Sequence, residues 1–91
     1  MANYLARVRV TLKPTVNDPQ GNTVAQALGT LGFDTVEEVR VGKFIEVKLT
    51  ASSQAEAEKQ ITLMGEKLLA NPVIELFDFE VEQAQADLPG H

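Results

Sequence analysis

The strongest constraint on the fold is a period-two alternation of apolar and polar residues near both ends of the chain. From Tyr4 to Leu12, small and branched apolar residues alternate with residues such as Arg7 and Arg9. This pattern is typical of a strand with one buried face, because successive side chains of a strand point to opposite sides of the sheet. A second alternating run, from Val73 to Val81, follows Asn71-Pro72, which cannot continue a helix. We therefore expect a strand near each end of the domain.

A helix and a hairpin are expected next to the first strand. Turn-forming residues precede a run in which apolar side chains recur at helical spacing, which predicts a helix from Asn22 to Leu31, closed by Gly32. The segments Val36 to Arg40 and Phe44 to Leu49 then alternate on either side of Gly42-Lys43. Two alternating runs around a glycine-containing turn predict a β-hairpin.

A second helix is expected before the last strand. The sequence Ser53-Gln54-Ala55-Glu56 matches a capping box, in which a hydroxyl and a carboxylate satisfy free amides of the first helical turn. The helix is predicted from Ser53 to Leu69, and its apolar stripe consists of Ala57, Ile61, Met64 and Leu68.

The order of these elements predicts an α+β domain. Strand, helix, strand, strand, helix, strand is the ferredoxin-like βαββαβ order, which forms a four-stranded antiparallel sheet with two helices on one face. A chain of 91 residues has material for one core, so we expect a single domain over residues 1–82. Residues 83–91 are polar and lack periodicity, and we expect them to form a mobile tail.

The composition excludes several kinds of chemistry. The sequence has no cysteine, and its one histidine is the terminal residue His91, so thiolate sites and histidine bases have no candidates inside the domain. The net charge of −5 argues against binding to nucleic acid or to anionic membrane, and no apolar stretch is long enough to span a membrane. The glycines lack the spacing of a nucleotide-binding loop. We expect no catalytic, cofactor-binding or metal-binding residue, and a cytoplasmic location.

One face of the predicted sheet has no helix to cover it. On this face we place Arg7 and Arg9 opposite Asp78, Glu80 and Glu82 of the last strand. Apolar residues also lie on this face and at the start of the last strand. Together they form a larger exposed apolar area than single apolar residues scattered over a surface would. We therefore expect the chain to form a homodimer or higher homo-oligomer through Leu5, Phe44, Ile74 and Leu76.

Functions that are common on this fold differ in how well they suit these residues. Acylphosphatase-like hydrolysis needs an arginine in the loop after the first strand, and residues 13–23 contain none. Binding of single-stranded RNA needs exposed aromatic residues on a basic surface, whereas the central strands offer only Tyr4 and Phe44 on an acidic chain. A metabolite-sensing domain of the amino-acid-binding (ACT-like) type remains an alternative, because such domains leave no strong sequence signal.

Three segments together resemble the PurS family. They are Asp18-Pro19-Gln20-Gly21 before the first helix, Arg40-Val41-Gly42-Lys43 at the hairpin, and Leu68 to Glu75 before the last strand. Each has a structural interpretation as well, since the first suits a turn into a helix, the second a hairpin turn and the third a helix end. Their order and spacing, and a match in length from about Tyr4 to Glu82, carry the resemblance.

The resemblance implies a small, non-catalytic subunit of phosphoribosylformylglycinamidine synthase in purine biosynthesis. Such a subunit joins a PurQ-type glutaminase to a PurL-type synthetase and supports ammonia transfer between them, while ATP, magnesium and glutamine are used by the complex. Because loops on a rigid scaffold are usual positions for binding residues, we expect partner contacts at the three segments. The candidates are Asp18, Gln20, Gly21, Arg40, Gly42, Lys43, Asn71, Pro72 and Glu75.

Overall fold

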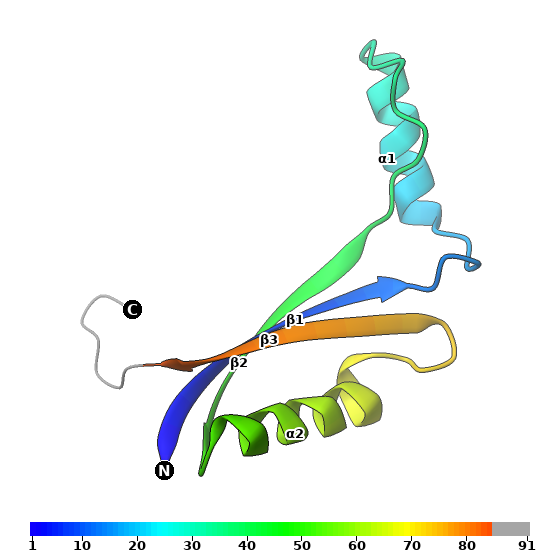
Figure 1. The fold of residues 1–91 in the computed structure, drawn as a ribbon. Coiled ribbons are helices and arrows are strands. Elements are labelled where there is room, and N and C mark those ends of the chain that lie inside the picture. Colours follow the sequence, from blue (N-terminus) through cyan, green and yellow to red (C-terminus); the bar gives the residue numbers. More distant parts are fainter. Residues whose placement is uncertain (85–91) are drawn as a thin grey trace.

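The fold is built on a central strand, β1 (Ala2–Leu12), which is flanked on both sides by antiparallel strands. A computed structural model describes residues 1–84, in which β2 (Gly42–Ala51) and β3 (Glu75–Ala84) complete a sheet of order β2-β1-β3 (Figure 1). Val8 lies opposite Ile45 of β2 and Phe79 of β3. The strands expected from the two alternating runs at the ends of the domain are therefore confirmed.

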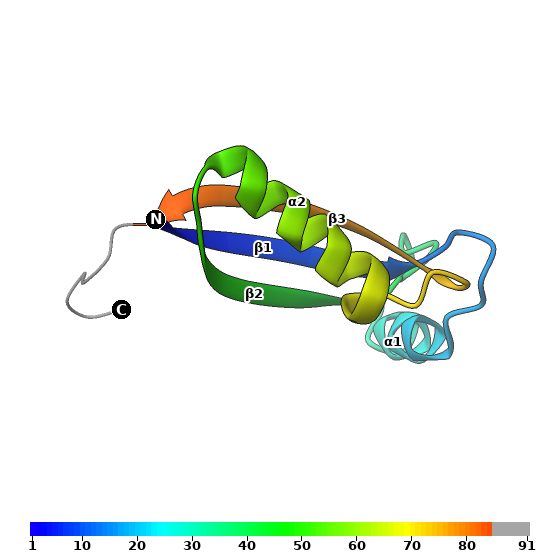
Figure 2. The ribbon, with the colours of Figure 1, turned by 90° about the horizontal axis from the view of Figure 1, so that it is seen from below.

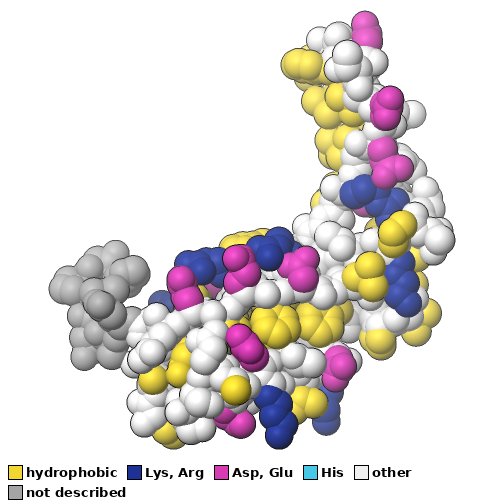
Figure 3. Space-filling view, in the orientation of Figure 1, with side chains coloured by type: hydrophobic (Ala, Val, Ile, Leu, Met, Phe, Trp, Pro, Cys, Tyr) yellow, Lys and Arg dark blue, Asp and Glu magenta, His cyan; other side chains and the backbone are white. Residues whose placement is uncertain are grey.

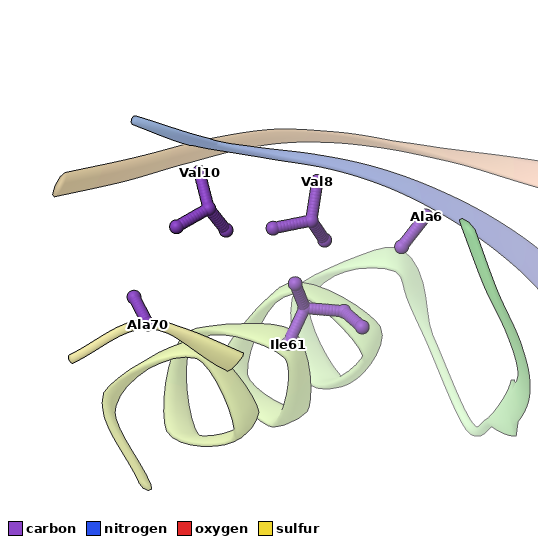
Figure 4. Packing of buried hydrophobic residues seen from close by; sticks show 5 residues of the cluster. All are labelled: Ala6, Val8, Val10, Ile61 and Ala70. Atoms are coloured by element: carbon purple, nitrogen blue, oxygen red, sulfur yellow. The ribbon is translucent and has the colours of Figure 1, made fainter. Parts of the chain in front are cut away.

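The hydrophobic core lies between this sheet and helix α2 (Gln54–Met64), which crosses one face of the sheet (Figure 2). Ala6, Val8 and Val10 of β1 point toward the helix, and Ile61 points back at them (Figure 4). Val8 and Ile61 are both 0% exposed. Burying a side chain of this size stabilises a fold by about 1.5–3 kcal/mol, so this layer is the main source of stability.

A π-helical turn, η1 (Gly65–Leu69), extends α2 and shifts its apolar stripe. The helix starts as expected, since Ser53 is the N-cap and its hydroxyl accepts a hydrogen bond from the Glu56 amide at 3.1 Å. The wider turn adds a residue, and Leu69 packs against the core while Leu68 is 83% exposed. The predicted stripe is therefore right as far as Met64 and wrong at Leu68.

The predicted hairpin does not form, and the sheet has three strands rather than four over residues 1–84. Helix α1 (Pro19–Thr30) and the return segment 31–41 project from the end of the sheet as an arm, which we define as residues 19–41 (Figure 1). A tight hairpin turn needs positive φ, and among the described glycines only Gly32, at 96°, has it. Val36 to Arg40 is therefore not a strand. This segment instead leads from the arm into β2.

The arm makes the chain more extended than a compact domain. The Cα radius of gyration is 17.2 Å, against about 12 Å for a compact chain of this length. Two helices accompany the sheet, but only α2 packs on its face, so the expectation of both helices on that face is wrong (Figure 2). The arm instead exposes the apolar residues Val24, Leu31, Phe33 and Val36.

The last strand is longer than expected. Gln83 and Ala84 belong to β3 rather than to the tail expected from residue 83 onward, and the rest of that tail lies outside the described residues. Within residues 1–84, none of the helices is both long and apolar enough to cross a membrane.

Gly65 gives a direct test of the packing between the π turn and the sheet. A methyl group at this position would overlap the ring of Phe77, which itself packs against the core. Overpacking of this kind costs about 1–3 kcal/mol, and the better helix propensity of alanine offsets up to about 1 kcal/mol. We expect Gly65→Ala to lower the free energy of unfolding by about 1–2 kcal/mol in urea titrations.

The matched control is Gly29→Ala in α1, where nothing lies within 4 Å of the added carbon. This variant should be as stable as the parent or slightly more stable. Equal stability of the two alanine variants would contradict the close contact between Gly65 and Phe77.

Candidate partner-binding site

The three sequence segments that carry the family resemblance meet where the arm leaves the sheet. We call this region the junction and define it as residues 13–21, 39–43 and 71–75. The Lys13 amide donates to the Ile74 carbonyl at 2.8 Å, which joins the end of β1 to the turn before β3. Segments far apart in the sequence therefore form one continuous surface.

Asp18 is the residue that holds the junction together. Its side chain is 3% exposed, and its two oxygens accept hydrogen bonds from the amides of Gly21 and Val41, both at 2.8 Å. The bond from Val41, followed by that from Gly21, lowers the pKa of Asp18, and the nearby charge of Arg40 adds to this effect against the opposing effect of burial. Asp18 is therefore an ionised clamp between α1 and the return segment, and both of its oxygens are engaged within the chain.

Gly21 allows the two sides of the arm to approach each other. A side-chain carbon at this position would overlap the carbonyl oxygen of Val39. Gly42 stands in a similar contact, since a carbon there would press on the carbonyl of Val10. Both predicted site residues thus allow close backbone approach within the chain.

Arg40 has a structural role and keeps free donors. Its Nη2 group donates to the carbonyl oxygens of Lys13 and Val16, at 3.0 and 2.9 Å. A guanidinium carries five N–H donors, and within residues 1–84 the Nε and Nη1 donors of Arg40 have no hydrogen-bond partner. The side chain is exposed and is held in place by its own chain, so its remaining donors point at a fixed position on the surface.

The segment Asn71 to Glu75 forms a self-contained turn. Glu75 accepts a hydrogen bond from the Asn71 amide at 2.7 Å, and Asn71 accepts one from the Val73 amide at 3.0 Å. Lys43 lies 3.8 Å from Glu75 and links this turn to β2. Beside the turn is a hollow of about 260 Å³, lined by Lys13, Gly65, Glu66, Ala70, Pro72, Glu75, Leu76 and Phe77.

The predicted candidates thus fall into two groups. Asp18, Gly21, Gly42, Asn71 and Glu75 build the junction. Gln20, Arg40, Lys43 and Pro72 have exposed side chains and form its outer surface. Sequence reasoning missed the clamp between Asp18 and Val41, because the two residues are distant in the chain and no local pattern joins them.

The uncovered face of the sheet carries the expected ion pairs. Basic and acidic side chains lie side by side over the sheet (Figure 3). Arg7 lies 2.7 Å from Glu82, and Arg9 lies 2.8 Å from Asp78 and 3.0 Å from Glu80. A hydrogen bond to Glu82 raises the pKa of Arg7 above its ordinary value, and one to Glu80 does the same for Arg9. These pairs are solvent-exposed, so they favour strand register more than stability.

Apolar residues lie among these charges. Leu5 points to the same side of β1 as Arg7 and Arg9. Phe44 lies opposite Arg9, and Leu76 lies opposite Thr11, so both are also on the uncovered face. Phe44 is 58% exposed and Leu76 is 49% exposed. Ile74 lies just before β3, next to this face, and is also exposed. Three of the four residues expected to mediate self-association are therefore exposed, whereas Leu5 is half-buried.

The ionisable side chains of the described residues do not gather into a metal site. Residues 1–84 contain no cluster of three or more His, Cys, Asp and Glu side chains placed to hold a metal ion. Asp18 is the buried polar residue in this range, and both of its carboxylate oxygens accept hydrogen bonds from backbone amides. His91 lies outside the described residues.

Comparison with known proteins agrees with these observations. A family model described as "PurS: Phosphoribosylformylglycinamidine (FGAM) synthase" matches residues 5–83. The phosphoribosylformylglycinamidine synthase subunit PurS of a Synechocystis species is 47% identical over 87% of this chain and 79% of its own length. PurS of Thermus thermophilus superposes with a TM-score of 0.80 at 42% identity, over 91% of this chain and 99% of that one.

A chain in the solved structure of PurLQS from Thermotoga maritima has the same fold, with a TM-score of 0.78 at 28% identity over 92% of this chain and all of that one. The family model and the relatives cover nearly all of the region in which the sheet, the arm and the junction lie. The chain belongs to the PurS family of phosphoribosylformylglycinamidine synthase subunits.

Proposed function

We propose that this chain is the small, non-catalytic subunit of a phosphoribosylformylglycinamidine synthase of purine biosynthesis, and that it joins a PurL-type synthetase to a PurQ-type glutaminase. Family membership and the likeness to a chain of the Thermotoga maritima PurLQS structure support this role. The observation that carries it is the junction, where Asp18 joins two of the three segments, contacts of Lys13 and Lys43 join the third, and exposed polar groups form the outer surface. A rigid polar surface without a catalytic cluster suits an adaptor.

The chemistry of the reaction gives an adaptor a purpose. Glutamine hydrolysis in such complexes uses a cysteine nucleophile, and this sequence has no cysteine. Glutamine, ATP and magnesium therefore belong to the partner subunits. Free ammonia is protonated in neutral water and loses its lone pair, so the two active sites need a shielded connection. A small protein that aligns both enzymes supports ammonia transfer from the glutaminase site to the synthetase site without catalysing a reaction itself. We expect the complex to be cytoplasmic.

Self-association is part of this proposal. The apolar residues of the uncovered face and those of the arm leave more exposed apolar surface than a monomeric domain usually carries. The extended shape points the same way, because an arm that projects from a small sheet gains stability when another chain covers it. A homodimer or higher homo-oligomer accounts for both features.

The outer surface of the junction is tested by affinity for the synthetase. If a buried carboxylate or phosphate of the partner binds the free donors of Arg40, Arg40→Ala should weaken association by about 1–3 kcal/mol, and Arg40→Lys should not restore it, because lysine lacks the planar pair of donors. Gln20→Ala should also weaken association. Isothermal titration against the synthetase measures both effects, and thermal melting separates them from loosening of the junction.

The matched control for these variants is Lys59→Ala, which removes an exposed cation from α2, away from the junction. It should bind like the parent. A metabolite sensor would behave differently, since it would bind a small ligand alone and would ignore the synthetase. If Gln20→Ala and Arg40→Ala bind normally with the fold intact, the junction is not the contact surface.

The pH dependence of the free energy of unfolding tests the role of Asp18 as a clamp. Because its folded-state pKa is lowered, Asp18 contributes stability that is complete above the ordinary carboxyl value of 3.8 and is lost as the pH falls through the lower folded value. We expect Asp18→Asn to be less stable than the parent at neutral pH and to lose less further stability on acidification below about pH 4. Urea unfolding at several pH values measures both quantities. Asp34→Asn changes an exposed aspartate of the same arm and serves as the control; if both variants gave the parent's profile, Asp18 would not be a clamp.

Self-association through the uncovered face is tested with a charge. Leu76→Lys should shift the chain toward monomer in sedimentation or light scattering at micromolar concentration, because it places an unpaired cation in the proposed contact. Leu68→Lys makes the same change at an 83% exposed position of η1 and should leave the mass unchanged. A parent chain that is monomeric under these conditions would remove the argument altogether.

A further inference from the structure

The outer edge of β3 has backbone groups without a partner. The Ile74 carbonyl faces β1, since it accepts a hydrogen bond from the Lys13 amide at 2.8 Å. Backbone groups of successive strand residues alternate between the two edges of a strand, so those of Phe77 and Phe79 face away from β1. No described residue bonds to them. Within residues 1–84, β3 is therefore an edge strand that is open on its outer side.

A side chain of α2 already takes the place of a neighbouring strand at one point of this edge. The first turn of α2 lies beside β3 (Figure 2), and Gln54 donates from Nε2 to the Val81 carbonyl at 2.6 Å. Val81 is odd-numbered, like Phe77 and Phe79, so this bond agrees with the alternation that turns these residues outward. An amide donor can thus approach the edge in the way that a strand would.

The side chains along this edge alternate between apolar and acidic. Phe77 and Phe79 pack against the core on the side of α2 and are half-buried. The acidic side chains point to the uncovered face and are exposed: Asp78, Glu80 and Glu82. Asp78 and Glu80 share the one guanidinium group of Arg9, so this acidic row keeps a net negative charge.

We propose that the open edge of β3 binds an extended segment of the glutaminase, in which basic residues alternate with apolar ones. The segment adds a fourth strand to the sheet, with its basic side chains beside Asp78 and Glu80 and its apolar side chains beside Phe77 and Phe79. In strand addition, main-chain hydrogen bonds supply affinity and alternate side chains supply specificity. The proposal rests on the proposed function and specifies the surface that holds the second enzyme.

Charge makes a second copy of the chain a poor occupant of this edge. Two copies that pair antiparallel through β3 bring together residues whose numbers have a constant sum. A centre at Phe79 sets Asp78 against Glu80, and a centre at Glu80 sets Asp78 against Glu82. Like charges directly opposite each other destabilise a sheet. The acidic row therefore disfavours self-pairing here and favours a strand with basic side chains.

The position of the edge suits the glutaminase rather than the synthetase. An adaptor holds two enzymes at the same time, so their contact surfaces cannot coincide. The proposed function places the synthetase at the junction, and β3 runs from there toward the N-terminal end of β1, where Ala84 lies opposite Asn3 (Figure 1). The ten residues of β3 span about 30 Å. The edge therefore offers a second surface beyond the junction.

Amide hydrogen exchange tests the pairing residue by residue. The isotope-labelled chain is exchanged alone, with the synthetase, and with both enzymes, and its amides are read by NMR after quenching. The glutaminase should slow exchange at Phe77 and Phe79 at least about tenfold, because their amides gain a strand partner. The amides of Asp78 and Glu80 face β1, so their exchange rates should change less. A contact made through side chains alone would not produce this alternation.

A charge variant tests the chemistry of the bound strand. Glu80→Lys should raise the dissociation constant of the glutaminase at least about fivefold, measured on the chain already bound to the synthetase. The matched control, Glu46→Lys, makes the same change on the same face of the sheet but on β2, at the opposite edge. It should bind like the parent. Added salt should weaken binding of the parent more than binding of Glu80→Lys.

The possible failures are distinguishable. Protection of Phe77 and Phe79 in the chain alone would assign the edge to a second copy, and protection with the synthetase alone would assign it to that enzyme; either result overturns the proposal. Equal effects of Glu80→Lys and Glu46→Lys would overturn the basic partner strand. If these amides stay unprotected while glutamine-dependent turnover still requires the chain, the strand pairing is wrong and the proposed function stands. If the chain does not bring the two enzymes together, both are wrong.

Discussion

The arm and the junction, which form the candidate site, depend on the carboxylate of Asp18. Its two oxygens bind the amides of Gly21 and Val41, so one buried charge caps α1 and fixes the segment that returns from the arm to β2. The Val41 amide is thereby directed to Asp18, and the expected hairpin is replaced by an arm. Arg40 reinforces this geometry through the carbonyls of Lys13 and Val16. The close approach of α1 to the return segment follows from this interaction.

The sequence predicts those parts of the fold in which local pattern and tertiary packing agree. The alternation in β1 and β3 and the cap at Ser53 predict elements that the structure contains, and the charges of Arg7 and Arg9 predict their partners on β3. The strand predicted at Val36 to Arg40 is wrong, because alternation shows only a propensity for pairing, and the bond from the Val41 amide to Asp18 joins residues that are distant in the sequence. The exposure of Leu68 depends on the π turn after Met64, which no periodic pattern reveals.

The candidate site could be located from the sequence but its organisation could not. The three segments that resemble the family meet at one end of the sheet, so the sequence places the candidate residues in one region. Individual roles depend on contacts between distant residues: Asp18 and Gly21 build the junction, whereas Gln20 and Arg40 form its surface. Turn chemistry alone gives both kinds of residue the same appearance, so the sequence cannot separate scaffold from contact surface.

An adaptor accounts for the junction, the exposed arm and the exposed apolar residues on the uncovered face of the sheet. The most direct test is a reconstitution of the glutaminase and synthetase with and without this chain, in which rates are followed separately with glutamine and with ammonia as nitrogen donor. We predict that glutamine-dependent turnover requires the chain, whereas ammonia-dependent turnover by the synthetase persists without it. Equal glutamine-dependent rates with and without the chain would contradict its role as the subunit that joins the two enzymes.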